Sequence, residues 1–198
     1  MGMPFITFQE IFDIILMTFA VGFIFKDTFP KPRYTGYTND DELLTQYSAS
    51  WFNWNDIFVA CLITAPGVIF HELAHKFVAL AMGIAATFHA AYFWLTMGII
   101  LKLVNFGFIF FIPGYVSHGG DVTPLQSAAI AFAGPFLNLV LWLGPWAVLK
   151  AHVKLTQKWK YVLILTRQIN MFLFIFNMLP IPPFDGWHFF TALFQVVF

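Results

Sequence analysis

The chain has 198 residues, of which 60% are hydrophobic and only 10% are charged, and it contains 27 Phe. This composition excludes an ordinary soluble globular domain and predicts a multi-pass protein of the cell membrane, surrounded by lipid. Ten basic and ten acidic residues give a formal net charge of zero with no long basic block, which excludes the usual signature of nucleic-acid binding.

The first apolar stretch, residues 1–25, predicts a transmembrane helix over about residues 4–25. At a rise of about 1.5 Å per residue this segment can cross a hydrocarbon core of about 30 Å. Glu10 and Asp13 interrupt it and no basic segment precedes it, so we expect a retained span rather than a cleaved signal peptide. The two carboxylates should face other helices or the membrane interface.

A polar connection over residues 26–55 follows and ends in Trp51 and Trp54. Two Trp in this place are typical of the aromatic belt at a membrane interface. The second span is predicted over residues 56–82, and Pro66 should kink or loosen its helix.

The second span carries the pattern H-E-x-x-H at His71, Glu72 and His75. Residues four apart share one helix face, so the two His can hold a metal ion while Glu72 reaches a water bound to that ion. Zinc suits such a site, because three protein ligands leave a position for a water whose pKa falls to about 7. Titratable groups are costly in a bilayer, which favours a metal site over satisfied polar groups in a buried helix. The single Cys61 excludes a thiolate zinc cage.

Residues 84–116 are apolar enough to span but are interrupted by Gly, Pro, Lys and Asn. Because a Lys at mid-span is costly and the aromatic and β-branched content favours strands, we predict hairpins that dip into the membrane against protein. A further full span is the alternative. His89, His118 and Asp121 are expected to be interfacial or loop residues rather than ligands.

A third span is predicted over residues 125–149. Its small residues Ala133 and Gly134 allow close helix approach, and Asn138 can form a hydrogen bond to another helix. A packing seam and a functional motif explain this pattern equally well. The basic loop 150–160 is too short for a domain outside the membrane.

The fourth span is predicted over residues 161–186 and contains three Pro within four positions near its end. These cannot continue a regular helix, so they free backbone groups that are tolerated only against protein or a water-filled cavity. A lone carboxylate at Asp185 needs a partner there, and the two-His site needs a third ligand. We therefore expect Asp185 to be that ligand, with His188, His118 and Asp121 as the next candidates.

Together these elements predict an all-α polytopic membrane protein with about four main transmembrane helices, a membrane-embedded β-hairpin region and a short C-terminal helix. Residues 1–198 are expected to form one membrane-embedded domain. Because Asp185 ends the fourth span and His71 lies well inside the second, these two spans should run roughly parallel. The metal should then lie about 10–20 Å below the membrane surface.

Three ordered motifs carry a family resemblance: H-E-L-A-H at 71–75, A-G-P-x-x-N at 133–138 and N-x-x-P-x-P-P-x-D-G at 177–186. With them the chain resembles the site-two protease family of intramembrane zinc metalloproteases. The similarity covers residues 57–188, and a strand-forming insertion in that family supports the hairpin prediction. Many members have a second Gly where this chain has Trp187, and larger members carry a PDZ or CBS domain, so the chain is expected to be a minimal form.

The resemblance implies a zinc-dependent intramembrane protease that takes part in regulated intramembrane proteolysis by cutting transmembrane segments of other membrane proteins. Because intact helices hide their backbone groups, a substrate must unwind first, and a strand edge within residues 84–116 can hold the unwound segment by β-augmentation. The resemblance also implies one Zn²⁺ per chain, held by His71, His75 and Asp185. It further implies that Glu72 is the catalytic base, that Asn177 steadies the substrate carbonyl or its oxyanion, and that Asn138 binds the substrate.

Two other functions fit the sequence less well. An inactive membrane scaffold predicts a broken ligand set, whereas this set is complete. A non-proteolytic metalloenzyme such as a di-iron lipid desaturase needs several His boxes, whereas the chain has six His and no adjacent pair. The membrane orientation stays open, because the basic residues of 26–33 and 150–160 favour a cytoplasmic position and the resemblance implies the reverse.

Overall fold

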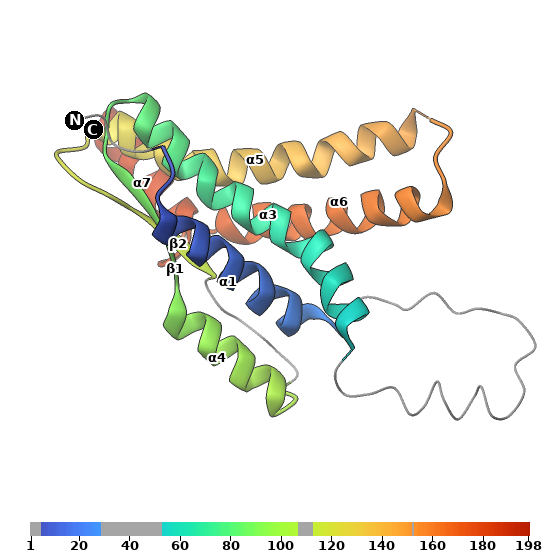
Figure 1. Ribbon diagram of the computed structural model, residues 1–198. Coiled ribbons are helices and arrows are strands. Elements are labelled where there is room, and N and C mark those ends of the chain that lie inside the picture. Colours follow the sequence, from blue (N-terminus) through green and yellow to red (C-terminus); the bar gives the residue numbers. More distant parts are fainter. Residues whose placement is uncertain (1–4, 29–52, 107–112, 152) are drawn as a thin grey trace, which may run out of the picture.

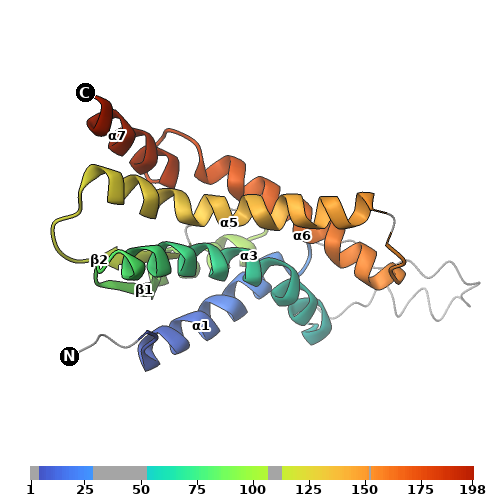
Figure 2. The same ribbon diagram turned by 90° about the horizontal axis from the view of Figure 1, so that it is seen from above.

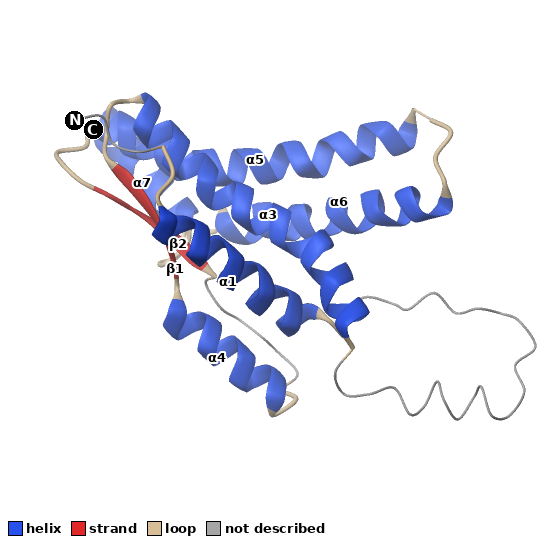
Figure 3. Ribbon diagram, in the orientation of Figure 1, coloured by secondary structure: helices blue, strands red, loops and turns tan. Residues whose placement is uncertain are grey.

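The computed structural model describes residues 5–28, 53–106, 113–151 and 153–198. Trp51, on which the predicted aromatic belt partly depends, lies outside this part of the chain. The basic residues at 31 and 33, which bear on the membrane orientation, lie outside it too. Figures 1 and 3 show a group of helices with a small two-stranded sheet near one end. The elements in chain order are α1 (Phe8–Phe25), α3 (Trp54–Ala81), β1 (Ala86–Ala90), α4 (Tyr92–Leu103), β2 (Gly114–His118), α5 (Pro124–Lys150), α6 (Gln157–Asn177) and α7 (Asp185–Val197).

The helices α3, α5 and α6 lie side by side, and α1 packs on the other side of α3 (Figures 1 and 2). Both views show α3 and α6 running roughly parallel while α5 runs in the opposite direction. The parallel course expected for the second and fourth spans is therefore confirmed. Pro66 lies inside α3, and this helix changes direction in its N-terminal half.

Three of the described helices are long and apolar enough to cross a membrane: α1, residues 56–81 of α3, and α5. They correspond to the first three predicted spans. The helix α6 has 21 residues, enough for a core of about 30 Å, but Lys160, Arg167 and Asn170 make it less apolar than the other three. The fourth span therefore remains a prediction.

The region 84–116 contains strands, but it is not a simple hairpin. The strands β1 and β2 pair antiparallel, from Ala86 opposite His118 to Ala90 opposite Gly114. A helix of 12 residues, α4, lies between the two strands, so the hairpin prediction is wrong for the residues of α4. This helix is also too short to cross a membrane, so the alternative of a full span does not hold for it. Lys102 lies in the last turn of α4, where its ammonium group is 2.8 Å from Asp27 rather than at mid-span.

The predicted fourth span, residues 161–186, is not one continuous helix, as its three Pro residues predict. The helix α6 ends at Asn177, and Asp185 begins the separate helix α7. The segment 178–184 between them contains the three Pro, which cannot supply the N–H groups that a continuous helix needs. Asp185 thus lies in the first turn of a helix, where the macrodipole favours a negative charge.

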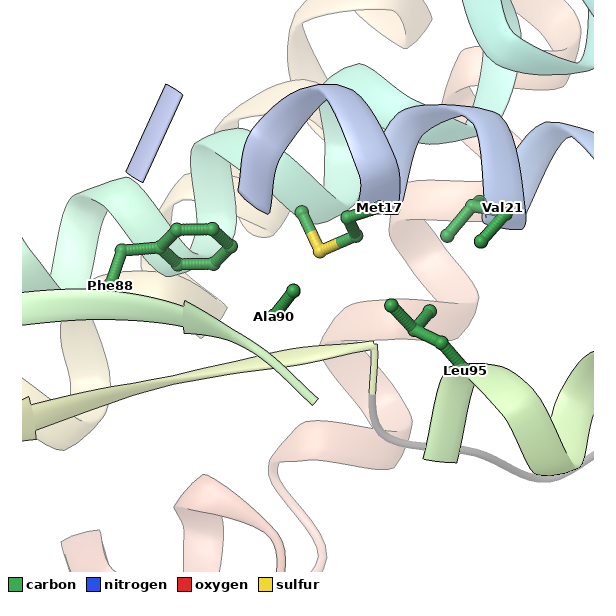
Figure 4. Packing of buried hydrophobic residues seen from close by; sticks show 6 residues of the cluster. Met17, Val21, Phe88, Ala90 and Leu95 are labelled. Atoms are coloured by element: carbon green, nitrogen blue, oxygen red, sulfur yellow. The ribbon is translucent and has the colours of Figure 1, made fainter. Parts of the chain in front are cut away.

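The sheet is fixed by an apolar cluster that joins α1, β1 and α4 (Figure 4). Met17 and Val21 of α1 point toward Phe88 of β1 and Leu95 of α4, and each of these side chains is at most 2% exposed. A second cluster joins the end of α3 to the sheet and to α5 through Ala79, Ile84, Ala86 and Ile130. The sheet is consequently held against the helix that carries the H-E-x-x-H pattern.

Candidate metal centre

The helix α3 presents His71 and His75 on one face, one turn apart. Both side chains are buried, and their Nε2 atoms lie 3.1 Å from each other. The rings are nearly perpendicular, with an interplanar angle of 80°. Two imidazole nitrogens therefore converge on one point, as the spacing of the pattern predicts.

Asp185 reaches the same point from the start of α7. Its Oδ2 atom lies 2.9 Å from Nε2 of His71 and 3.3 Å from Nε2 of His75. Ligand atoms around a tetrahedral zinc ion are about 3.3–3.4 Å apart when each bond is about 2.0–2.1 Å long. Among the described residues these three form the one group of His, Cys, Asp or Glu whose ligand atoms lie within 4.8 Å of one another. The spacing and the donor types both fit a zinc ion.

Each His ring is oriented by a hydrogen bond on its other side. The Nδ1 atom of His71 lies 2.5 Å from Oδ1 of Asn138, and Nδ1 of His75 lies 2.6 Å from the carbonyl oxygen of Ile130. Both partners are acceptors, so each Nδ1 carries the proton and donates it. Each Nε2 is then left with a free lone pair directed at the common point, which is the arrangement that metal-binding His residues need.

Asn138 itself belongs to a buried amide network. Its side chain is 0% exposed, and its Nδ2 donates to the carbonyl of Gly67 and to Oδ1 of Asn170. Asn170 lies in α6 and donates in turn to the carbonyl of Thr166. Asn138 therefore sits behind His71 and does not line the cavity described below. Its hydrogen bond orients the His71 ring, while its predicted role in substrate binding stays a prediction.

Gly134 leaves the space in which an ion can sit. A Cβ atom added at this position would lie 2.6 Å from Nε2 of His71 and closer still to Nε2 of His75. Both atoms are the proposed ligand atoms, so any side chain here would compete with the ion for the same volume. The sequence suggested only close helix packing for this Gly, because its position opposite the two His depends on how α5 packs against α3.

We expect Gly134→Ala to reduce the zinc content of the purified protein well below that of the wild type. The added methyl group would occupy the space between the two imidazoles, and neither ring can move without losing its Nδ1 hydrogen bond. Metal analysis after gel filtration measures the effect. Gly144→Ala is the matched control, because Gly144 lies in the same helix and a Cβ there would meet nothing within 4 Å. Equal zinc loss in both variants would indicate a general effect of the substitution on α5 rather than a local effect at the candidate metal centre.

The cluster opens into a cavity of about 410 Å³. Glu72 lines this cavity next to the two His, and it is 8% exposed. Asn177, at the end of α6, lines the same space, as do residues 113–116 of β2 and the segment before it. The structure thus brings Glu72 and Asn177 to one cavity with the three clustered side chains, while their catalytic roles remain predictions.

The other candidate ligands are outside the cluster. His118 and His188 line the cavity, whereas Asp121 does not. His89 donates or accepts a hydrogen bond with Ser117 at 2.9 Å and stacks on Tyr115, so it has a role in the sheet. Asn170 was missed by the sequence reasoning, although a buried amide within an apolar helix is a signal that could have identified it.

Similarity to known proteins extends over most of the chain. The family model described as "Peptidase family M50" matches residues 142–198, which include Asn177 and Asp185. A protein of Methanocaldococcus jannaschii named "Putative zinc metalloprotease MJ0611" is 37% identical over 180 residues, covering 90% of this chain and 81% of that protein. A protein of Synechocystis sp. named "Putative zinc metalloprotease sll0528" is 30% identical over 128 residues, covering 65% of this chain and 29% of that protein.

Proposed function

Because this chain belongs to peptidase family M50, the site-two protease family, we propose that it is a zinc-dependent endopeptidase that cleaves transmembrane segments of other proteins within the membrane. The observation that carries the proposal is the cluster of the buried His71 and His75 with the partly buried Asp185, which opens with Glu72 into one cavity. These three residues would hold one Zn²⁺. When bound, zinc supplies a Lewis acid that activates water and polarises the peptide carbonyl.

Glu72 is the residue placed to move the proton. It lies next to the ligand His71 in sequence and lines the cavity, so it can accept a proton from the attacking water and pass it to the leaving amine. Asn177, on α6, lines the same cavity. Its amide can donate a hydrogen bond to the substrate carbonyl oxygen as negative charge develops there.

The strand β2 offers backbone groups for an unwound substrate. The N–H of Ala91 donates to Pro113 and that of Gly119 to Ala85, so the hydrogen-bonded pairs of the ladder involve the odd-numbered residues. In an antiparallel pair the residues between these direct their N–H and C=O groups away from the partner strand. On β2 these are Gly114, Val116 and His118, all of which line the cavity. A substrate segment can therefore add to this edge as a third strand.

The competing functions have less support. An inactive scaffold does not need a carboxylate 2.9 Å from a buried His and a second, buried carboxylate in the same cavity. A di-iron enzyme needs ligands for two ions, typically with several Glu and His residues. The described residues contain one ligand group of three side chains, which suffices for a single ion.

Reconstitution of the purified protein in liposomes with a labelled single-span substrate tests the proposal. We expect two fragments whose new ends, identified by mass spectrometry, lie within the apolar segment of the substrate. The Glu72→Gln variant in the same liposomes is the control for a contaminating protease. A zinc-loaded protein that cuts only the soluble part of the substrate would contradict intramembrane cleavage.

A further inference from the structure

Two buried carboxylates of α1 bind the backbone of β1. Glu10 and Asp13 are each 1% exposed although they lie in an apolar helix. The Oε1 atom of Glu10 accepts a hydrogen bond of 2.8 Å from the N–H of Phe88, and Oδ2 of Asp13 accepts one of 3.1 Å from the N–H of Ala90. Glu10 thus binds the N–H at the middle of the strand, and Asp13 binds the next outward-directed N–H, at the strand's C-terminal end.

These are two of the three N–H groups that β1, through its even-numbered residues, does not use to pair with β2. The ladder bonds involve the odd-numbered residues, so Phe88 and Ala90 direct their N–H groups to the outer edge of the sheet. Unpaired edge groups of this kind are where another strand can add. The carboxylates occupy the two at Phe88 and Ala90, whereas the edge of β2 borders the cavity. The sheet therefore has one edge closed at Phe88 and Ala90 and one edge at the candidate metal centre.

The closed edge is also tied to the helix that carries the candidate ligands. Lys76, which follows His75 directly and is 1% exposed, donates to Oε1 of Glu10. The Oε2 atom of Glu10 accepts from the N–H and the hydroxyl of Thr7, at 2.7 and 3.0 Å. Every oxygen of this acid is engaged, so Glu10 connects α1, β1 and α3 at a single point.

Asp13 is anchored in the same way on its second oxygen. Its Oδ1 accepts hydrogen bonds from Nε2 of Gln9, at 2.9 Å, and from the hydroxyl of Tyr92, the first residue of α4. Only one residue separates Tyr92 from the end of β1, so Asp13 holds both the end of the strand and the start of the helix after it. The position of the sheet along α1 is set at two successive points.

We infer that Glu10 and Asp13 are positioning residues for proteolysis: they hold the sheet against α3 and close the outer edge of β1, so that an unwound substrate segment pairs with β2 beside the metal ligands. This inference rests on the proposed protease function. Buried carboxylates are expensive in a membrane protein, and packing alone needs none at this place, because Met17, Val21 and Phe88 already form an apolar cluster there.

The inference predicts a specific kinetic defect. Asp13→Ala removes the acceptor for Ala90, and the double variant Glu10→Ala, Lys76→Met removes the acceptor for Phe88 together with the ion pair, without leaving one buried charge alone. For Asp13→Ala we expect KM for the single-span substrate in liposomes to rise about tenfold or more, since hydrogen bonds to charged groups are lost. The zinc content should stay at the wild-type level, and kcat should change by less than about threefold. The double variant should shift KM in the same direction.

Three comparisons separate positioning from general damage. Asp13→Asn keeps an oxygen acceptor and should restore KM, while Thr18→Val, which removes a hydroxyl bonded only within α1 to the carbonyl of Ile14, should leave KM unchanged. Amide hydrogen exchange should be faster at residues 86–90 in Asp13→Ala than in the wild type. Unchanged KM and exchange in Asp13→Ala, or a parallel loss of zinc and kcat, would overturn the inference. A zinc-loaded wild type that cleaves no substrate would instead refute the proposed function, and the exchange result would still report on the sheet.

Discussion

Replacement of Glu72 by Gln is expected to leave zinc binding unchanged and to lower the rate of peptide cleavage by about 10²–10⁴-fold, the usual contribution of a general base. Gln has nearly the same shape as Glu, and Glu72 does not belong to the cluster of three ligand atoms, so the site should keep its ion. Gln cannot accept the proton of the attacking water. Single-turnover cleavage in liposomes, with metal analysis of the same sample, measures both quantities.

A carboxylate elsewhere provides the control for this result. Asp121→Asn removes a charge from an exposed loop residue that does not line the cavity, so it should cleave at the wild-type rate. If Glu72→Gln retained full activity, the proton would have to go to another group, and Glu72 would be only a residue of the cavity wall.

Removal of any one of the three clustered side chains should abolish both stoichiometric zinc and cleavage. The wild type is expected to hold about one zinc per chain, and a two-ligand remnant binds the ion too weakly to survive dialysis against a mild chelator. The variants are His71→Ala, His75→Ala and Asp185→Ala. Mass spectrometry of the metal content after dialysis gives the stoichiometry for each.

The neighbouring His residues provide matched controls for this experiment. His118 and His188 line the same cavity, but their side chains are not part of the cluster. His118→Ala and His188→Ala should therefore retain about one zinc per chain. Zinc retained in Asp185→Ala but lost in His188→Ala would transfer the third ligand to His188.

The location of the cluster was predictable because two strong local constraints meet there. The spacing of His71 and His75 places them on one helix face whatever the rest of the chain does. Asp185 followed from the Pro residues before it, since a carboxylate at a broken segment needs a polar partner. The distance of 2.9 Å between Asp185 and His71 agrees with that expectation.

The course of the chain after the H-E-x-x-H helix was only partly predictable. Short apolar runs fit strands and helices alike, and the aromatic residues of Tyr92–Leu103 led to a prediction of hairpins where α4 forms. The free-energy cost of a charged Lys at mid-span does not apply to Lys102, because α4 ends next to this residue and Asp27 forms an ion pair with it. Such a pairing depends on tertiary contacts that local patterns do not contain.

The same limit applies to the residues around the site. The sequence indicated that Glu10 and Asp13 face protein or interface, but their partners on β1 are set by how α1 packs on the sheet. Asn138 was recognised as part of a motif, yet its contact with His71 requires α5 to lie against α3. Long-range packing, rather than residue type, decides which polar group supports which ligand.

X-ray absorption spectroscopy at the zinc edge of the purified wild-type protein is the most direct test of the metal centre. We expect a first shell of four light atoms, with two imidazole nitrogens at about 2.0–2.1 Å and carboxylate or water oxygens at about 2.0–2.2 Å. Asp185→Ala should lose this signal together with the metal. Absence of zinc from the active wild-type protein, or a first shell with fewer than two imidazoles, would contradict a centre built from His71, His75 and Asp185.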